Sequence, residues 1–276
     1  MEPTTRRGQV ITVTSGKGGV GKTTTTANIG VALARRGRAV AVVDADIGLR
    51  NLDVVMGLEN RVVYNLMHVV RGAVEAERAL IRDKRVPGLM MLAADQHSDK
   101  DDVSPEEMVQ VCDDLRPHVD YVIVDSPAGI EQGFRNALAP ADRVVLVTTP
   151  EVSAVRDADR VVGLTEAAGK AAPVLVLNRI KPDLVARGDM MTTADVLDIL
   201  RVDLLGIVPE DSGIVAATNR GEPVALDAAS RAGRAFHNIA ARLEGESVPL
   251  MALDDAEAKG FLKSLTSLFR SGPDGG

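Results

Sequence analysis

The segment SGKGGVGKTT, residues 15–24, constrains this chain more than any other feature of its sequence. It fits the phosphate-binding loop pattern, in which two glycines bracket four residues and are followed by Lys and then Ser or Thr. The preceding run, QVITVT at 9–14, is apolar and β-branched, while Ile29, Ala32 and Leu33 after the loop have helical spacing. The motif therefore lies between a predicted strand and a predicted helix, which is the context that a nucleotide-binding P-loop requires.

The composition of the loop indicates how it would bind a nucleotide. Glycines adopt backbone angles that other residues avoid, so successive N–H groups can approach phosphate oxygens closely, and the start of the helix adds its dipole. Lys22 is expected to contact the outer phosphates, and the Thr23 hydroxyl is expected to bind Mg²⁺. A glycine-rich turn without a ligand is the alternative, and the flanking strand and helix disfavour it. The expected nucleotide-binding residues of the loop are Gly16, Lys17, Gly18, Gly19, Val20, Gly21, Lys22, Thr23 and Thr24.

Acidic residues follow two further apolar runs, which the sequence predicts to be buried parallel strands at 39–43 and 121–124. Ligands of such sheets bind outside the carboxyl ends of the strands. Asp125 matches the carboxylate that supports Mg²⁺ in P-loop ATPases. Of Asp44 and Asp46, one side chain can point to the Mg²⁺ shell and the other to the attacking water. Capping of a turn or helix is the alternative for either residue.

Strand and helix patterns alternate along the remainder of the chain. The region 60–88 is predicted to form a short helix, a turn at Gly72 and a second helix, and Ser104 is a good N-cap for the next helix. The 276 residues, 45% of them apolar, suffice for one large core. The chain is thus predicted to be a single-domain α/β P-loop NTPase with a mostly parallel twisted sheet and helices on both faces. Further strands are expected at 89–93, 143–148, 173–177 and 204–208, and further helices at 151–168 and 229–243.

The last part of the chain is predicted to be an amphipathic tail. The ATPase domain is expected to span 1–244, followed by a linker at 245–253 and the tail at 254–276. On a helix, the apolar residues of the tail form one stripe with basic residues at its margins. A helix docked on the protein's own core is the alternative, but the basic margins and the terminal position favour a helix that lies in a membrane interface. The expected membrane-binding residues are Phe261, Leu262, Lys263, Leu265, Leu268 and Phe269.

Composition disfavours several other classes of protein. The net charge of −7 and an aromatic content of 2% argue against a basic DNA-binding surface and against base stacking, so no specific nucleic-acid partner is expected. The single cysteine, Cys112, lies in an apolar helical pattern and is predicted to be buried in a reducing compartment. The N-terminus carries no apolar run typical of a secretory signal, and no run is long enough to cross a bilayer. We expect a cytoplasmic protein that binds peripherally to the inner face of the cell membrane.

The segment GKGGVGKT resembles the deviant P-loop of the MinD/ParA family of ATPases. The segments DADIGLRNLD, DSPAGIE and TTPEVSAVRDADR, together with the amphipathic tail, extend this resemblance over most of the chain. In the family, the lysine at the position of Lys17 contacts the ATP of the facing subunit, whereas without the resemblance Lys17 would be read as a solvated surface lysine. The resemblance also implies that Asn178 and the loop at Pro209 hold the adenine. An asparagine after a strand is otherwise a common turn former.

This resemblance implies a slow, Mg²⁺-dependent ATPase that forms a homodimer on binding ATP and attaches to anionic membrane lipid through its tails. It further implies a role in placing the division septum, with a MinC-like septation inhibitor and a MinE-like regulator as partners. The expected catalytic residues are Lys17, Lys22 and Asp46, of which Asp46 would orient the attacking water. Thr23, Asp44 and Asp125 would support Mg²⁺, partly through water.

Three related functions are the alternatives. A ParA-type DNA or cargo partition ATPase shares these motifs, but the acidic balance and the apolar tail disfavour it. A metabolic phosphotransferase of the same fold and a scaffold that binds ATP without hydrolysing it also fit the loop. The nitrogenase iron-protein branch is excluded, because a cluster shared between two subunits requires at least two cysteines per chain.

Overall fold

The computed structural model describes residues 8–99 and 102–251. The predicted membrane residues between Phe261 and Phe269, and the end of the predicted linker, lie outside the described residues. The described part contains one sheet with the strands β1 (Gln9–Thr14), β2 (Val40–Asp44), β3 (Ile81–Arg82), β4 (Leu89–Leu92), β5 (Tyr121–Asp125), β6 (Arg143–Thr148), β7 (Val174–Ile180) and β8 (Leu204–Pro209).

Helices connect these strands and cover the sheet. The α-helices are α1 (Lys22–Arg35), α2 (Leu52–Val55), α3 (Leu66–Val70), α4 (Ala76–Ala79), α5 (Pro105–Leu115), α6 (Gln132–Leu138), α7 (Val152–Ala167), α8 (Pro182–Arg187), α9 (Thr193–Leu200), α10 (Ser212–Asn219) and α11 (Arg231–Leu243). Short 3-10 helices are η1 (Glu59–Arg61), η3 (Arg116–His118) and η4 (Val224–Leu226). None of the helices in the described ranges combines the length and apolar character needed to cross a membrane.

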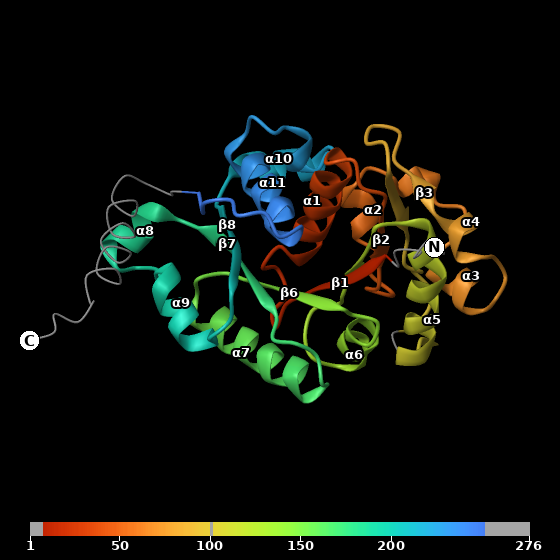
Figure 1. Cartoon of the computed structure of the whole chain (residues 1–276), viewed down its shortest axis with the longest axis horizontal. Coiled ribbons are helices and arrows are strands. Elements are labelled where there is room, and N and C mark those ends of the chain that lie inside the picture. Colours follow the sequence, from red (N-terminus) through yellow and green to blue (C-terminus); the bar gives the residue numbers. More distant parts are fainter. Residues whose placement is uncertain (1–7, 100–101, 252–276) are drawn as a thin grey trace, which may run out of the picture.

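The strand order is β3-β4-β2-β5-β1-β6-β7-β8, and every pairing is parallel except that of β3 with β4 (Figure 1). The chain moves outward on one side of β1 to form β2 and β4, returns to β5, and then continues on the other side from β6. The loop after β1 therefore lies at the point where the direction of strand addition reverses, where ligands of open parallel sheets bind. The predicted single α/β domain with a mostly parallel sheet is confirmed.

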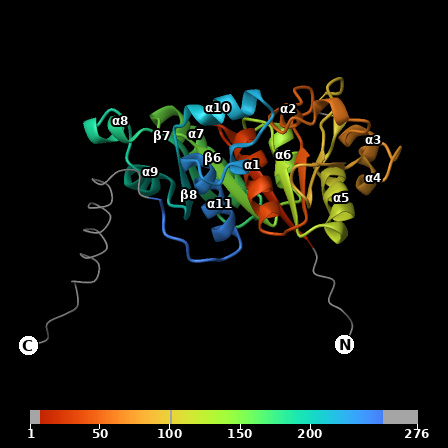
Figure 2. The same cartoon turned by 90° about the horizontal axis from the view of Figure 1, so that it is seen from above.

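Two layers of helices enclose the sheet (Figures 1 and 2). The helices α1, α2, α10 and α11 pack on one face, and α5, α6, α7 and α9 pack on the other. Successive residues of a strand point to opposite faces, so Val10 packs against the α5 layer whereas Ile11 and Val13 pack against the α1 layer. This two-sided burial explains why the strands are continuous apolar runs rather than alternating ones.

Most predicted elements form close to their expected positions, with two differences. β7 continues past Leu177 to Ile180, so Asn178 lies inside the strand rather than after it, next to an irregular register with β8. The region 60–88 forms α3 and α4 around a turn at Gly72, as predicted, but it ends in the two-residue antiparallel strand β3. A strand of two residues is too short to produce a periodic signal in the sequence.

Candidate nucleotide-binding site

The predicted site residues from β1, β2 and β5 meet at the carboxyl edge of the sheet. β1 and β2 both pair with β5, and Asp44 lies directly opposite Asp125 in the register. The P-loop follows β1 at the same edge, and the last residues of β7 and β8 bring Asn178 and Pro209 to it from farther along the sheet. The parallel topology thus gathers residues that are more than a hundred positions apart in the sequence.

The P-loop fits tightly between its neighbours. Gly21 precedes α1 with φ +94°, a left-handed conformation that favours glycine, and a Cβ at this position would lie 2.3 Å from the Asn178 side-chain nitrogen. A Cβ on Gly16 would lie 2.2 Å from the carbonyl oxygen of Asp157 in α7. These two glycines therefore permit close approach of the loop to β7 and α7.

Lys22 is buried and forms an ion pair with Asp125, with 3.2 Å between Nζ and Oδ1. Thr26, one helical turn later in α1, donates its hydroxyl to the same carboxylate oxygen at 2.8 Å. Thr26 was not predicted to be a site residue, although its position in the TTTT run after Lys22 places it on the same face of the helix. Lys22 Nζ also lies 3.5 Å from the Thr23 hydroxyl oxygen, so the ammonium group lies between Thr23 and Asp125, two of the three residues expected to support Mg²⁺.

The surroundings of Asp125 fit a cation. Its second carboxylate oxygen, Oδ2, is buried and has no hydrogen-bond partner among the described residues. A buried carboxylate oxygen without a partner is unfavourable in the unligated protein, and a hard cation or its water shell would satisfy it. Thr23 and Asp125 therefore fit a Mg²⁺ site, and their roles in holding the ion stay predictions.

Asp44 is fully buried and holds the segment that follows β2. Its two carboxylate oxygens accept hydrogen bonds from the backbone N–H groups of Asp46 at 3.0 Å and Leu52 at 3.1 Å. Burial and the neighbouring charge of Asp125 raise the pKa of Asp44 to about 7. In the structure Asp44 therefore shapes the loop that carries Asp46, while its support of Mg²⁺ stays a prediction.

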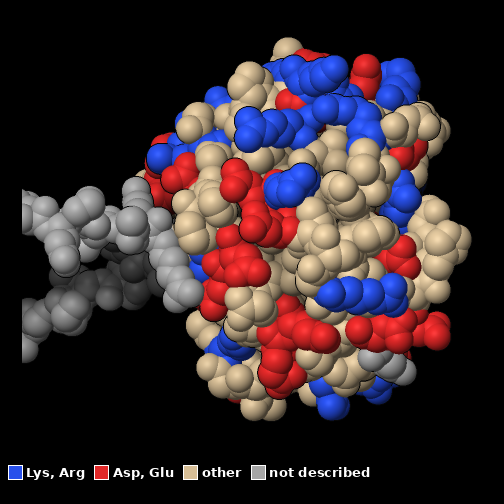
Figure 3. All heavy atoms as spheres, turned by 90° about the vertical axis from the view of Figure 1, so that its right-hand side faces the viewer, with Lys and Arg blue, Asp and Glu red and all other residues tan. Residues whose placement is uncertain are grey.

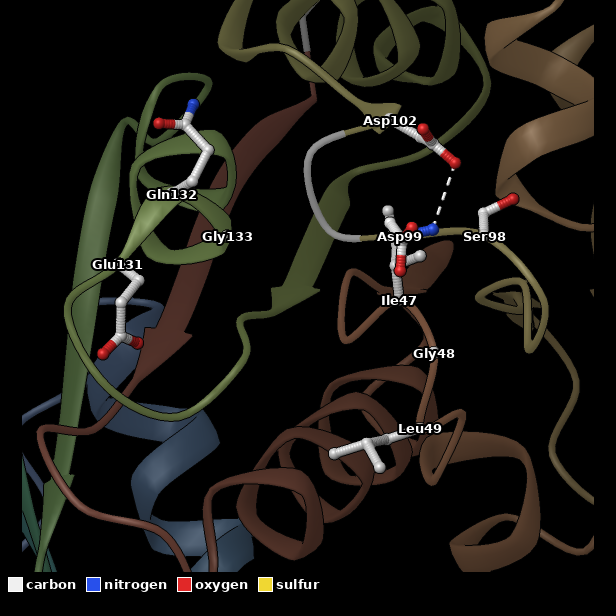
Figure 4. Close-up of a pocket in the computed structure, with 9 residues that line it drawn as sticks. All are labelled: Ile47, Gly48, Leu49, Ser98, Asp99, Asp102, Glu131, Gln132 and Gly133. Carbon is white, nitrogen blue, oxygen red and sulfur yellow. Dashed lines mark hydrogen bonds between the residues drawn. The ribbon is translucent and has the colours of Figure 1, made fainter.

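The Asp46 side chain is also buried, and a hollow lies beside the residues that follow it. The hollow, of about 660 Å³, separates the segment after β2 from the N-terminal end of α6 (Figure 4). Asp99 and Asp102 lie on one side of the hollow, and Glu131 lies on the other. The Asp99 N–H donates a hydrogen bond to Asp102 Oδ2 at 3.0 Å. Residues 47–49 after β2 and residues 131–133 after β5 are thus not packed against each other at this hollow.

Lys17 lies in a different environment from Lys22. Its side chain is 42% exposed, donates a hydrogen bond to Ser153 Oγ at 2.9 Å, and lies 3.9 Å from a carboxylate oxygen of Glu151. Ser153 and Glu151 stand at the start of α7 and were not predicted to contact the loop. The structure therefore places the second lysine at the rim of the site, directed toward α7 rather than toward Asp125.

Asn178 contacts the P-loop directly. Its side-chain amide donates to the Val20 carbonyl oxygen at 2.8 Å and its own Oδ1 accepts from the Arg179 N–H at 3.0 Å. Pro209 is the last residue of β8, and a short loop leads from it to α10, which begins at Ser212. Asn178 therefore links the P-loop to β7 through a hydrogen bond in this structure. The adenine contacts of Asn178 and Pro209 stay predictions.

Comparisons with known proteins agree with this geometry. A family model described as the CobQ/CobB/MinD/ParA nucleotide binding domain matches residues 11–224. The chain is 51% identical over 264 residues to the septum site-determining protein MinD of Bacillus subtilis, covering 95% of this chain and 98% of that protein.

Solved structures are similar over the same part of the chain. A chain of the MinC:MinD cell division protein complex of Aquifex aeolicus has a TM-score of 0.82 and 48% identity, covering 88% of this chain and 98% of that chain. The septum site-determining protein MinD of Pyrococcus horikoshii, complexed with Mg-ADP, has a TM-score of 0.78 and 30% identity, covering 86% and 96%.

Proposed function

This chain belongs to the CobQ/CobB/MinD/ParA family of nucleotide-binding proteins, and from that membership we propose that it is an ATP-driven membrane switch that helps to position the division septum. The observation that carries the nucleotide part of the proposal is the buried contact of Lys22, Thr26 and Asp125 at the base of the P-loop. The similarity to MinD proteins supports the role in cell division.

Each site residue has a proposed role in hydrolysis. Lys22 leaves Asp125 to contact the outer phosphates of ATP, and Thr23 and Asp125 hold Mg²⁺ directly or through water. Bound Mg²⁺ would neutralise charge on the phosphate oxygens. Asp46 accepts a hydrogen bond from the attacking water, and Asp44 keeps Asp46 in place through the hydrogen bond to its backbone N–H. No stronger base is among these residues, so turnover should be slow until a partner stimulates it.

We further propose that ATP joins two copies at their nucleotide edges. Exposed apolar side chains follow the carboxyl ends of three strands around the P-loop: Leu49 after β2, Val152 after β6 and Val215 after β8, all more than half exposed. Such residues are unfavourable in water and suit an interface that forms only in one nucleotide state. Lys17 stands at the same edge, where release from Ser153 and Glu151 would let it reach the partner's nucleotide.

Membrane attachment would follow from the dimer. A single short amphipathic tail binds a bilayer weakly, because burial of a few apolar side chains, at about 1.5–3 kcal/mol each, is offset by ordering the segment. Two tails in one dimer make the second insertion intramolecular, which strengthens attachment by about a hundredfold or more. Hydrolysis would separate the copies and release them from the membrane.

A protein of the MinC type and a regulator of the MinE type are the proposed partners, on the basis of the resemblance and the MinC:MinD complex.

Sedimentation with anionic vesicles tests this function. The full chain and a chain ending at Leu253 would each be mixed with vesicles in ATP, ADP or no nucleotide. We expect only the full chain in ATP to sediment with the vesicles. Equal sedimentation in all three nucleotide conditions would refute the switch, and sedimentation of the shortened chain would refute the role of the tail. Salt-sensitive binding of random DNA by the ATP form, without vesicle binding, would favour the partition ATPase instead.

A further inference from the structure

The two helical layers of the domain carry opposite charge. The layer of α5, α6, α7 and α9 is rich in acidic residues, which include Glu106, Glu107, Asp114, Asp159, Glu166, Asp195 and Asp198. The helices of the opposite layer have a single acidic residue, the buried Asp53, and carry the basic residues Arg35, Arg231, Arg234 and Arg242 besides Lys22 of the nucleotide site. A chain with a net charge of −7 thus has one face on which the helices are basic.

At the β3 end of this face, four basic residues lie on η1, on β3 and on the turn between β3 and β4. We name Arg61, Arg82, Lys84 and Arg85 the basic corner. Arg61 donates to the Arg82 carbonyl oxygen at 2.7 Å, which joins η1 to β3. Arg85 pairs with the buried Asp83, whereas Arg61, Arg82 and Lys84 form no ion pair with a carboxylate of the described residues. Figure 3, which faces the β3 end, shows Lys and Arg gathered along the upper edge and Asp and Glu over the middle and lower part.

The turn of the basic corner and the start of the segment after α11 both lie at the amino ends of the strands, opposite the nucleotide site. Gly88 ends the β3–β4 turn, and its carbonyl oxygen accepts a hydrogen bond from the Val40 N–H at 2.8 Å. A Cβ on Gly88 would lie 2.8 Å from the Arg38 carbonyl oxygen. Arg38 forms an ion pair with Glu244, directly after α11. Gly88 and Arg38 therefore link the β3–β4 turn of the basic corner to Glu244, which begins the segment that leads to the predicted tail.

The segment after α11 is held on this edge as far as the structure describes it. Arg242 donates to the Val248 carbonyl at 2.9 Å, to the Pro249 carbonyl at 2.7 Å and to the Leu205 carbonyl at 2.9 Å, at the start of β8. In Figure 2 this segment, drawn in blue, runs along the side opposite α10. The first half of the predicted linker is thus docked along the amino ends of the strands, up to the start of β8.

We propose that the basic corner is a second membrane contact, which binds the headgroups of anionic lipid when the tails are inserted. The proposal rests on the proposed membrane switch and adds a surface and an orientation to it. Each Lys or Arg near an anionic bilayer strengthens binding several-fold, and the effect decays within a Debye length. A dimer with its two-fold axis normal to the helical layers would present both basic faces to one plane, with both acidic layers away from the lipid.

Charge reversal tests the contact without disturbing the fold. The variant Arg82→Glu with Lys84→Glu changes two exposed side chains that make no hydrogen bond to the described residues. The matched control, Arg135→Glu with Arg160→Glu, makes the same change in net charge on α6 and α7 of the opposite layer. ATPase activity and ATP-dependent dimer formation in solution serve as checks that both variants fold.

The expected result is that the Arg82/Lys84 variant binds vesicles of phosphatidylglycerol and phosphatidylcholine at least about tenfold more weakly than the control in ATP, with a smaller dependence on salt. On vesicles of phosphatidylcholine alone, the two variants should bind equally. Equal binding of both variants to the anionic vesicles would overturn the contact while leaving the switch intact. Loss of random-DNA binding by the Arg82/Lys84 variant with unchanged vesicle binding would also overturn it, and would assign the corner to nucleic acid. Absence of ATP-dependent vesicle binding by the unsubstituted chain would remove both proposals.

Discussion

Replacing Lys22 with Met should destabilise the unligated protein far more than the same replacement at Lys17, although the two lysines lie in one loop. Lys22 and Asp125 form an ion pair in which the side chains are 7% and 1% exposed. Removing the ammonium group leaves Asp125 buried beside Asp44 without a positive partner, which costs about 3–5 kcal/mol. Lys17 pairs at 3.9 Å with Glu151, and the side chains are 42% and 60% exposed. Such an exposed pair contributes less than about 1 kcal/mol.

Denaturant unfolding without nucleotide measures both losses. If the dependence of the free energy of unfolding on denaturant is unchanged, the shift in midpoint gives the difference in stability. A cost of less than about 1 kcal/mol for Lys22→Met, or equal costs for Lys17→Met and Lys22→Met, would show that the buried ion pair does not stabilise the unligated protein as proposed.

The same pair of variants separates nucleotide binding from dimerisation. Lys17→Met should bind ATP as a monomer, because the P-loop backbone and the Lys22 pair are untouched, but it should not form the ATP-dependent dimer or hydrolyse ATP. Lys22→Met should lose nucleotide affinity as well. Sedimentation velocity in ATP and ADP distinguishes these outcomes, and a normal ATP-dependent dimer of Lys17→Met would contradict the proposed contact across the interface.

Three further outcomes follow from the described contacts. The pKa of Asp44 is raised from 3.8 to about 7, so ionisation of Asp44 favours the unfolded chain. The contribution of Asp44 to stability therefore falls as pH rises from about 4 to about 7. The destabilisation by Asp44→Asn, measured by denaturant unfolding, should be smaller at about pH 8 than at about pH 5. Asp142→Asn is the control, because Arg116 lowers the pKa of Asp142 and its effect should be equal at both pH values. Burial raises the pKa of the Cys112 thiol to about 12, so iodoacetamide should label Cys112 only after unfolding; full labelling of the native chain would contradict the burial. Ser104→Ala should cost about 1 kcal/mol of unfolding free energy through loss of the α5 cap, whereas Ser104→Asp should retain most of the stability.

Local sequence signals predicted seven of the eight described strands and the longer helices α1, α5, α7 and α11, because each signal acts over a short distance. Apolar β-branched runs predicted β1, β5 and β6 to within a residue, and the Ser104 cap with Pro105 predicted the start of α5. The P-loop spacing predicted that Lys22 and Thr23 lie at a nucleotide site, since glycines between a strand and a helix leave few other conformations.

The tertiary structure decided which of these residues meet. Strand order is set by long-range packing, so only the sheet shows that Asp44 and Asp125 are neighbours. Burial of Asp44 within the sheet and the charge of Asp125 beside it together raise the pKa of Asp44. The two lysines of one loop differ in burial because α7 and β5 lie on different sides of it, which no local pattern encodes. Likewise, the composition shows an acidic chain, but the distribution of its charges between two helical layers depends on which face of the sheet each helix covers.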